Sequence, residues 1–274
     1  MKNYPRSRIM TVIGYILFSA AFMGASLMIA TYAEHMNSIA DDQNRIGEEL
    51  AAGSTGVSVA AASDRIIVID PGHGGEDGGA SASTGLLEKD LNLSVSGSIA
   101  DMCVLFGVPY KMTRYDDRLL YDMYSERSDY TGHKKSLDLA NRLRFTEESG
   151  AALFVGIHMN KFTDPKYSGL QVYYSPNADD SAAIAEVIQN YTKEHLQPEN
   201  TRSIKAATSA IYLLRRLTMP AVLVECGFLS NPDEAARLAT PAYRSELAGT
   251  VFVPLLEYLT HLPTDAAPRS DGTL

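Results

Sequence analysis

The sequence predicts an α/β fold in which a parallel or mixed sheet of about six strands is covered by helices on both faces. Short apolar runs, several of them rich in β-branched residues, alternate along residues 65–261 with longer segments whose apolar positions follow helical spacing. Alternation of this kind is typical of sheets that carry helices on both faces. The stretch has roughly 200 residues, which is enough to bury one substantial hydrophobic core.

Each expected element follows from its own pattern. Apolar runs predict strands near residues 66–70, 108–113, 152–157, 169–174, 210–215 and 220–225. Helical spacing predicts helices over about residues 89–106, 136–149, 179–196, 232–238 and 241–260. The fourth helix has a clear start, since Asn231, Pro232 and Glu234 occupy the positions of an N-cap, a first-turn proline and a capping-box glutamate.

A histidine follows the first expected strand directly. The strand ends in Asp70-Pro71-Gly72, and His73 comes next with glycines on both sides. Glycine permits positive φ and close approach to the backbone, and the carboxyl ends of strands are where ligands and metals bind in open α/β sheets. The alternative is a surface turn with a chance histidine. It explains neither the glycines nor the strand, so we interpret His73 as functional.

Two further residues complete a possible metal site. Glu88 lies near the start of an expected helix, where a carboxylate complements the helix dipole and needs no other explanation. His158 ends the apolar run 152–157, and a histidine in such a place is often a satisfied core residue. Together with His73, however, they form a set of two imidazoles and one carboxylate. That set suits zinc and leaves a fourth position open for water.

Glu225 ends the apolar run 220–225 and is the candidate for catalysis. A charge at the end of a buried strand is unfavourable unless it is paired or solvated in a cleft. Zinc lowers the pKa of its bound water to about 7, but a base is still needed to carry the proton to a leaving amine. We predict that Glu225 is this base. The alternative is a salt bridge to a neighbouring arginine.

Several segments resemble one known family, the zinc-dependent N-acetylmuramoyl-L-alanine amidases of bacterial cell walls, of the amidase-3 type. The matching segments are IVIDPGHGGEDGGA, LLEKDLNL, MTRYDD, FVGIHMN, SGLQVYY and PAVLVECGFLSN, in that order. The resemblance implies a phosphorylase/hydrolase-like fold. It also implies one Zn²⁺ held by His73, Glu88 and His158, and a catalytic role for Glu225. The implied reaction is hydrolysis of the amide between N-acetylmuramic acid and the L-alanine of the peptidoglycan stem peptide.

The ends of the chain differ from this expected catalytic domain, residues 65–261. Residues 1–8 are basic and are predicted to be cytoplasmic, and residues 9–33 carry no charge over a stretch longer than the ~20 residues that span a bilayer. We favour a transmembrane signal anchor at 9–33 over a removed signal peptide, which would give a secreted protein. The positive-inside rule then places the catalytic domain outside the cell membrane. Residues 34–64 are predicted to be a linker and 262–274 a disordered tail.

Composition restricts the possible partners. The net charge of −9 argues against nucleic acid and against electrostatic attraction to anionic wall polymers as the main binding force. The two cysteines, Cys103 and Cys226, offer no disulfide framework, and we interpret both as packing residues. No appended wall-binding module is evident. We therefore expect the anchor, the groove or a protein activator that the sequence does not identify to direct the chain to peptidoglycan.

Two other classes of protein would have different sequence signatures. One is a catalytically silent peptidoglycan-binding protein on the same fold, whose signature would be a missing ligand or glutamate. The other is a tethered interaction protein with structural zinc, which usually has four protein ligands. Neither signature is present. The layout of one domain behind a short anchor is similar to that of spore-cortex amidases, whose action allows muramic lactam to form, although cell separation or wall turnover would use the same chemistry.

Overall fold

The computed structural model describes residues 65–124 and 130–261. The strands are β1 (Ile67–Pro71), β2 (Tyr110–Met112), β3 (Leu153–Asn160), β4 (Gln171–Tyr174), β5 (Lys205–Ala206) and β6 (Ala221–Phe228). The helices are α2 (Glu88–Leu105), α3 (Lys134–Glu148), α4 (Asp180–His195), α5 (Pro232–Ala239) and α6 (Pro241–His261). The five expected helices and five of the six expected strands are therefore confirmed, with bounds that differ by a few residues.

The strands form a six-stranded mixed sheet in the order β2-β1-β3-β6-β4-β5. Strands β2, β1, β3 and β6 are parallel, whereas β4 runs antiparallel to β6. The carboxyl ends of β1, β3 and β6 consequently lie at the same edge of the sheet, and they are the ends that lead to the predicted site residues.

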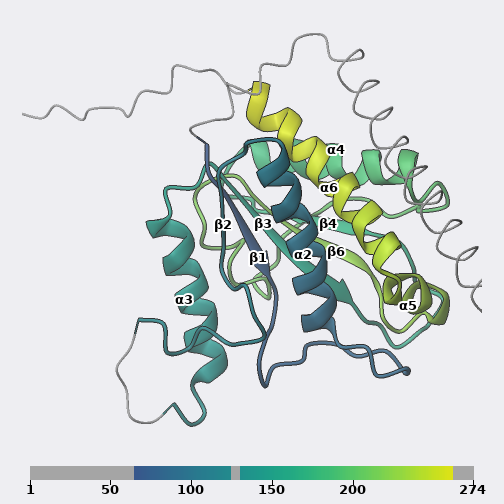
Figure 1. The fold of residues 1–274 in the computed structure, drawn as a ribbon, viewed down its shortest axis with the longest axis horizontal. Helices are drawn as coiled ribbons and strands as arrows, with labels where there is room; N and C mark the ends of the chain where they lie inside the picture. The colour runs from purple at the N-terminus through teal and green to yellow at the C-terminus, as the bar shows by residue number, and fades with distance from the viewer. Residues whose placement is uncertain (1–64, 125–129, 262–274) are drawn as a thin grey trace, which may run out of the picture. The chain divides into compact units, whose positions relative to one another are not determined.

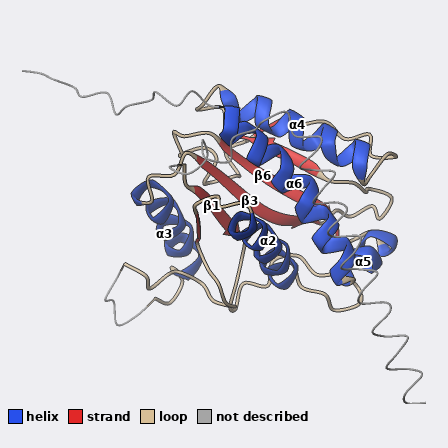
Figure 2. Ribbon diagram, turned by 45° about the horizontal axis from the view of Figure 1, so that its top comes forward, coloured by secondary structure: helices blue, strands red, loops and turns tan. Residues whose placement is uncertain are grey.

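Helices cover both faces of this sheet, as Figures 1 and 2 show. On one face, α2, α4, α5 and α6 pack over the larger hydrophobic core, which includes Ile67 and Ile69 of β1. On the other face, α3 and the segment 207–219 cover a smaller core around Val68 and Phe154. Alternate residues of β1 thus enter different cores, because successive side chains of a strand point to opposite faces.

The expected strand at 210–215 is wrong. That segment forms a series of turns, and the sixth strand is the two-residue β5 at the sheet edge. The apolar residues Leu213, Leu214 and Leu217 are buried against the smaller core rather than aligned in the sheet. Their hydrophobicity therefore reflects the covering of a sheet face, which an apolar run alone does not distinguish from a strand.

The start of α5 agrees only in part with its expected pattern. The side chain of Asn231 accepts hydrogen bonds from the N–H groups of Asp233 and Glu234, and Pro232 is the first helical residue. The Glu234 carboxylate, however, does not complete a capping box. It is buried and accepts hydrogen bonds from the N–H groups of Phe228 at 2.7 Å and Gly169 at 2.9 Å. It connects the end of β6 to the loop before β4.

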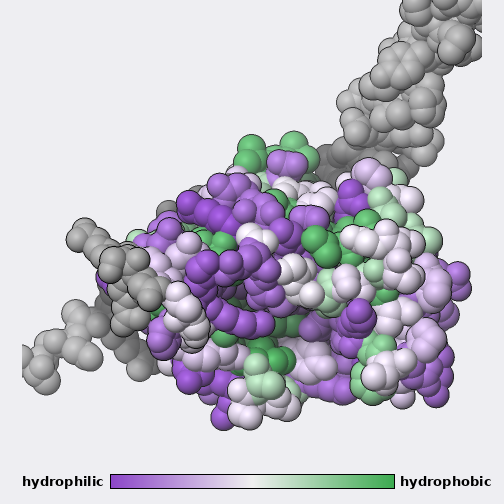
Figure 3. All heavy atoms as spheres, turned by 90° about the horizontal axis from the view of Figure 1, so that it is seen from below, coloured by the Kyte–Doolittle hydropathy of each residue, from purple (hydrophilic) through white to green (hydrophobic). Residues whose placement is uncertain are grey.

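Several expectations lie outside the described residues, namely the anchor at 9–33, the linker at 34–64 and the tail at 262–274. Within the part of the chain that is described, no helix combines the length and hydrophobicity needed to span a bilayer. The face seen from below in Figure 3 is mostly hydrophilic, with smaller hydrophobic areas scattered among the polar ones.

Candidate active site

The loop after β1 holds His73 in an unusual conformation. Its backbone φ is 61°, in the left-handed region that non-glycine residues rarely adopt and that often marks functional sites. The glycines of this loop make room for other site residues. A Cβ on Gly72 would lie 2.1 Å from the ring of His158, and one on Gly79 would lie 2.5 Å from Oε2 of Glu88. Only glycine therefore allows the loop to lie this close to them.

Two buried arginines hold the backbone of the same loop. Arg142 donates to the carbonyl oxygens of His73 at 2.7 Å and Pro71 at 2.9 Å. Arg114 donates to those of Pro71 at 2.9 Å and Gly72 at 3.0 Å. Hydrogen bonds from charged donors are stronger than neutral ones, so this pair fixes the loop in the conformation that presents the imidazole.

The charge of Arg142 is compensated by two buried carboxylates, Asp70 and Asp138. Burial by itself raises the pKa of Asp70, but the guanidinium of Arg142 and the hydroxyl of Thr113 contribute to a larger combined opposing effect, and the pKa is lowered. Neither arginine is predicted from the sequence to be part of the site. Arg114 lies in the segment MTRYDD, but nothing local indicates that its side chain reaches the histidine loop.

Glu88 is the first residue of α2 and is buried. Its Oε2 accepts a hydrogen bond from the N–H of Ala80 at 2.7 Å, and its Oε1 accepts one from the N–H of Met159 at 3.1 Å. Burial raises the pKa of a carboxyl group, but hydrogen bonding to His158 and His73 outweighs it and holds the pKa of Glu88 well below its usual range. The group is therefore ionised and fixed in position.

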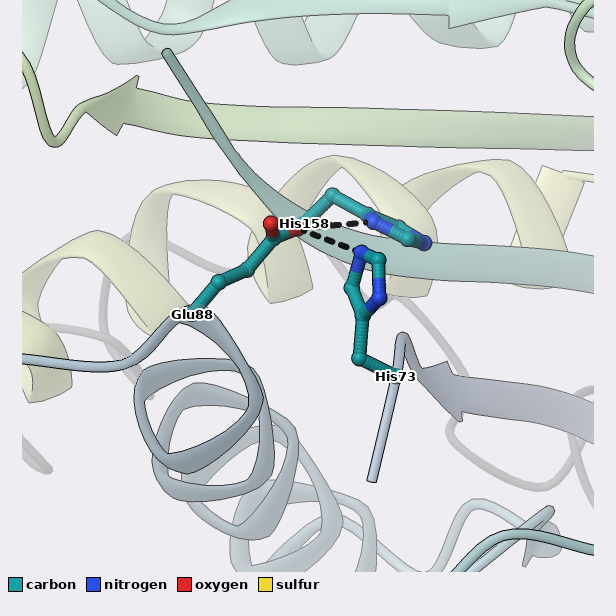
Figure 4. Close-up of side chains that lie close together, drawn as sticks. All are labelled: His73, Glu88 and His158. Atoms are coloured by element: carbon teal, nitrogen blue, oxygen red, sulfur yellow. Dashed lines mark hydrogen bonds and ion pairs between the residues drawn. The ribbon is translucent and has the colours of Figure 1, made fainter. Parts of the chain in front are cut away.

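The three predicted ligands converge, as Figure 4 shows. Oε1 of Glu88 lies 2.9 Å from Nδ1 of His158 and 3.2 Å from Nε2 of His73. One potential ligand atom from each of the three residues lies within 4.8 Å of the others. The structure thus brings together side chains from the β1 loop, the start of α2 and the end of β3.

This arrangement fits a zinc ion. Ligands about 2.0–2.1 Å from a tetrahedral zinc are separated from one another by about 3.3 Å, close to the two observed separations. Two imidazoles and one carboxylate also match the donor set of catalytic zinc sites, which keep one position open. In the described ranges, these three residues are the group of histidine, cysteine and carboxylate side chains with metal-binding geometry.

Asp77 is a site residue that is absent from the predicted set. Its Oδ2 lies 3.0 Å from Nδ1 of His73, and its position four residues later in the glycine-rich loop was the available signal. A carboxylate on one ring nitrogen orients a histidine and leaves the other nitrogen for a metal. Burial lowers the pKa of His73, but the carboxylates of Glu88 and Asp77 outweigh it and raise that pKa.

Glu225 lies on β6 directly beside His158 on the parallel strand β3. Its Oε2 is buried, and no described residue forms a hydrogen bond with it, which argues against a structural salt bridge at this atom. Burial raises the pKa of Glu225 to about 7. A cavity of about 260 Å³ is lined by His73, His158 and Glu225. An unpaired carboxyl group therefore faces the same space as the metal-binding cluster.

The sheet edge, the cavity and the histidine–carboxylate cluster are together typical of a hydrolase. Comparison with known proteins identifies which one. A family model described as N-acetylmuramoyl-L-alanine amidase matches residues 67–255. The germination-specific N-acetylmuramoyl-L-alanine amidase of Bacillus subtilis is 36% identical over 198 residues, covering 72% of this chain and 81% of that protein.

Solved structures agree with this match. The CwlD amidase of Clostridioides difficile, in complex with the GerS lipoprotein, has a TM-score of 0.67 and 34% identity, covering 72% of this chain and 98% of that chain. The amidase AmiC2 of Nostoc punctiforme has a TM-score of 0.60 and 33% identity, covering 71% and 97%. The chain therefore belongs to the amidase-3 family of N-acetylmuramoyl-L-alanine amidases.

Proposed function

We propose that this peptidoglycan amidase is zinc-dependent, that His73, Glu88 and His158 bind the ion, and that Glu225 is the catalytic carboxylate. The observation that carries the proposal is the convergence of three ligand atoms within 4.8 Å beside an unpaired buried carboxyl group. A bound zinc would supply Lewis-acid polarisation of the lactyl carbonyl and a more acidic water. The surrounding residues supply orientation and proton transfer.

Glu225 has the properties required of a proton carrier. With a pKa of about 7, its ionised and neutral forms are both populated near neutral pH. The carboxylate accepts a proton as the water oxygen bonds to the carbonyl carbon, and it donates that proton to the alanine nitrogen as the C–N bond breaks. Asp77 keeps the ring of His73 oriented, and Arg142 and Arg114 hold its loop, so the site needs little rearrangement during the reaction.

The test is mass spectrometry of purified peptidoglycan digested with the full-length chain, with and without a zinc chelator. We expect free stem peptides with N-terminal alanine, lost on chelation and restored by added zinc. Unchanged peptidoglycan in the presence of bound zinc would contradict the proposal. It would favour the alternative of a catalytically silent peptidoglycan-binding protein, in which substrate binds but no new amine forms.

We further propose a role in maturation of the spore cortex, where removal of stem peptides permits formation of muramic lactam. The support is the likeness to a B. subtilis protein named as germination-specific and to the C. difficile CwlD amidase. Spores from a strain that lacks the gene should contain no muramic lactam, and the wild-type gene should restore it. Restoration by a Glu225→Gln gene would contradict an enzymatic role.

The location and the partner are also proposals. We propose that residues 9–33 anchor the chain in the cell membrane with residues 65–261 outside, on the support of the uncharged span and its basic flank. Protease added to intact protoplasts should then remove the catalytic domain and leave the anchor. The complex of CwlD with a lipoprotein supports a protein partner for this chain, which co-purification from the native membrane would test.

A further inference from the structure

A row of polar side chains continues across the sheet from the catalytic cluster. His158 on β3 is in register with Glu225 on β6, and Glu225 is in register with Gln171 on β4. Residues directly opposite each other on neighbouring strands point to the same face of a sheet. Gln171 therefore lies on the same face as the two site residues, one strand beyond Glu225.

Gln171 positions the side chain of Arg202. Its Oε1 accepts hydrogen bonds from Nη2 of Arg202 at 2.6 Å and from Nε at 3.2 Å. Gln171 is itself buried, and its Nε2 donates to the carbonyl of Ser203 at 2.7 Å. On another side, Cζ of Arg202 lies 4.6 Å from the centre of the Phe228 ring. The guanidinium group is thus held in place before any ligand arrives.

Arg202 forms no salt bridge in the described parts of the chain, and its Nη1 donates no hydrogen bond there. Its charge acts on the buried carboxyl groups of Glu225 and Glu234 only at longer range, where it opposes the rise in their pKa caused by burial. By contrast, Arg142 is paired with two carboxylates. Arg202 also lines a cavity of about 430 Å³ together with Gln171, Lys205 and Lys166, and Lys166 is paired with Asp164. A fixed, unpaired guanidinium in a cavity is suited to bind a carboxylate.

We infer that Arg202, held by Gln171 and Phe228, is a specificity residue that binds a carboxylate of the substrate's peptide two or three residues from the scissile amide. The number of peptide residues between the scissile amide and this carboxylate follows from the distance across the sheet. Neighbouring strands are about 4.8 Å apart, and an extended peptide advances about 3.3–3.6 Å per residue. The inference rests on the proposed function, since it assumes that the scissile bond lies beside Glu225. With this role, Arg202 would make the enzyme prefer anionic peptides through a site that is separate from the reacting groups.

The test uses two N-acetylmuramoyl-L-alanyl tripeptides as probes. One carries side-chain carboxylates at its second and third residues, and the other carries the matching carboxamides. We expect the full-length wild-type chain to have the higher kcat/KM for the acidic probe. Arg202→Gln should lower the ratio of the two kcat/KM values roughly tenfold, as expected for loss of one charge-assisted hydrogen-bonded contact. Arg202→Lys should retain part of the preference.

Arg144→Gln is the matched control, because it removes the same charge from an exposed side chain that pairs with Glu148 on α3. It should leave the ratio unchanged. Equal loss of activity toward both probes in Arg202→Gln would show a structural role only and would overturn the inference. Absence of any preference in the wild-type chain would do the same.

A binding measurement separates this inference from the proposed function. Calorimetry with the Glu225→Gln chain should show tighter binding of the acidic probe, and the second change Arg202→Gln should abolish the difference. Should the wild-type chain hydrolyse neither probe while this difference is present, the carboxylate site would stand and the catalytic assignment would fall. Equal binding of both probes would overturn the carboxylate site even if both are hydrolysed.

Discussion

The site contains residues with functional side chains and glycines that leave room for those side chains. His73, Glu88 and His158 present the proposed ligand atoms, and Gly72 and Gly79 lie where a Cβ would collide with these side chains. Replacement of either glycine would displace one of the proposed ligands, so both glycines belong to the site.

Gly79→Ala should weaken zinc binding. The added Cβ would lie 2.5 Å from Oε2 of Glu88 and 2.8 Å from Cδ2 of His73, and the backbone φ of 66° is unfavourable for alanine. We expect a loss of about 10–100-fold in zinc affinity, typical of a disturbed ligand environment, measured by competition with a chromogenic chelator. Gly85→Ala is the control, since its φ is 89° but no atom lies within 4 Å of its Cβ. If both variants lost zinc affinity equally, backbone strain alone would explain the effect and the predicted collision with Glu88 would be contradicted.

Glu225→Gln should separate catalysis from metal binding. Removal of a general base typically lowers turnover by about 10²–10⁴-fold, and the three ligand residues are left intact. Zinc content by atomic emission should stay at the wild-type level while release of alanine-terminated peptides falls. His158→Ala should instead lose zinc. Retention of normal turnover by Glu225→Gln would exclude the assigned role.

The same carboxyl group makes stability depend on pH. Burial raises the pKa of Glu225 from 4.5 to about 7, so the folded, metal-free protein binds more protons than the unfolded chain between these values. The free energy of unfolding should therefore fall as pH rises from 4.5 to 7, by on the order of 3 kcal/mol at most. Glu225→Gln should be more stable than wild type at pH 8 and equal to it at pH 4, measured by urea unfolding after chelation. A difference that is constant with pH would contradict this.

At the scale of elements, α3 shows how a helix can serve the site without contributing a ligand. Arg142 on its buried side reaches the loop after β1, whereas Arg144, two residues later, is exposed. Replacement of each arginine in turn therefore compares how much a buried and an exposed arginine of the same helix contribute to stability.

Arg142→Leu should destabilise the fold by about 3–5 kcal/mol, because it leaves the buried carboxylates of Asp70 and Asp138 without the positive charge that they pair with. Arg144→Leu removes only an exposed pair with Glu148 and should change stability by less than about 1 kcal/mol. Urea unfolding at pH 7 measures both. Since Arg142 lowers the pKa of Asp70, its contribution is present above pH 3.8 and is lost as pH falls through the lower, folded-state pKa. Similar effects of the two changes would contradict the structural role of Arg142.

At the scale of the molecule, the proposed ligands come from three separate parts of the chain, and an ion bound by all three would stabilise only the folded state. Zinc at about 1,000 times its Kd would add about 4 kcal/mol, which is roughly 10 °C in Tm for a domain of this size. Scanning calorimetry should show this shift in the wild-type chain and none in His158→Ala. His195→Ala, at an exposed helix end, should keep the shift. A zinc-induced shift that persists in His158→Ala would exclude this site as its source.

Local patterns were sufficient to predict most of the elements and the side chains that converge at the edge of the sheet. His73, His158 and Glu225 each follow an apolar run, and parallel strands bring the ends of such runs to one edge of the sheet. The pattern was insufficient at 210–215, because an apolar segment that covers a sheet face has the same composition as a strand within it. It was also insufficient at Glu234, whose hydrogen-bond partners are brought near by folding.

Periodicity and the positions of polar residues at strand ends are local properties, so the sequence predicts the α/β class, the order of most elements and the three side chains that converge at the sheet edge. The distant groups that support these side chains depend on the tertiary structure. The contacts of Arg114 and Arg142 with the histidine loop, and of Gln171 with Arg202, join residues whose separation along the chain carries no signal. Their positions depend on how the helices and loops pack on the sheet, and hydrogen-bond geometry at that level is set by the whole fold.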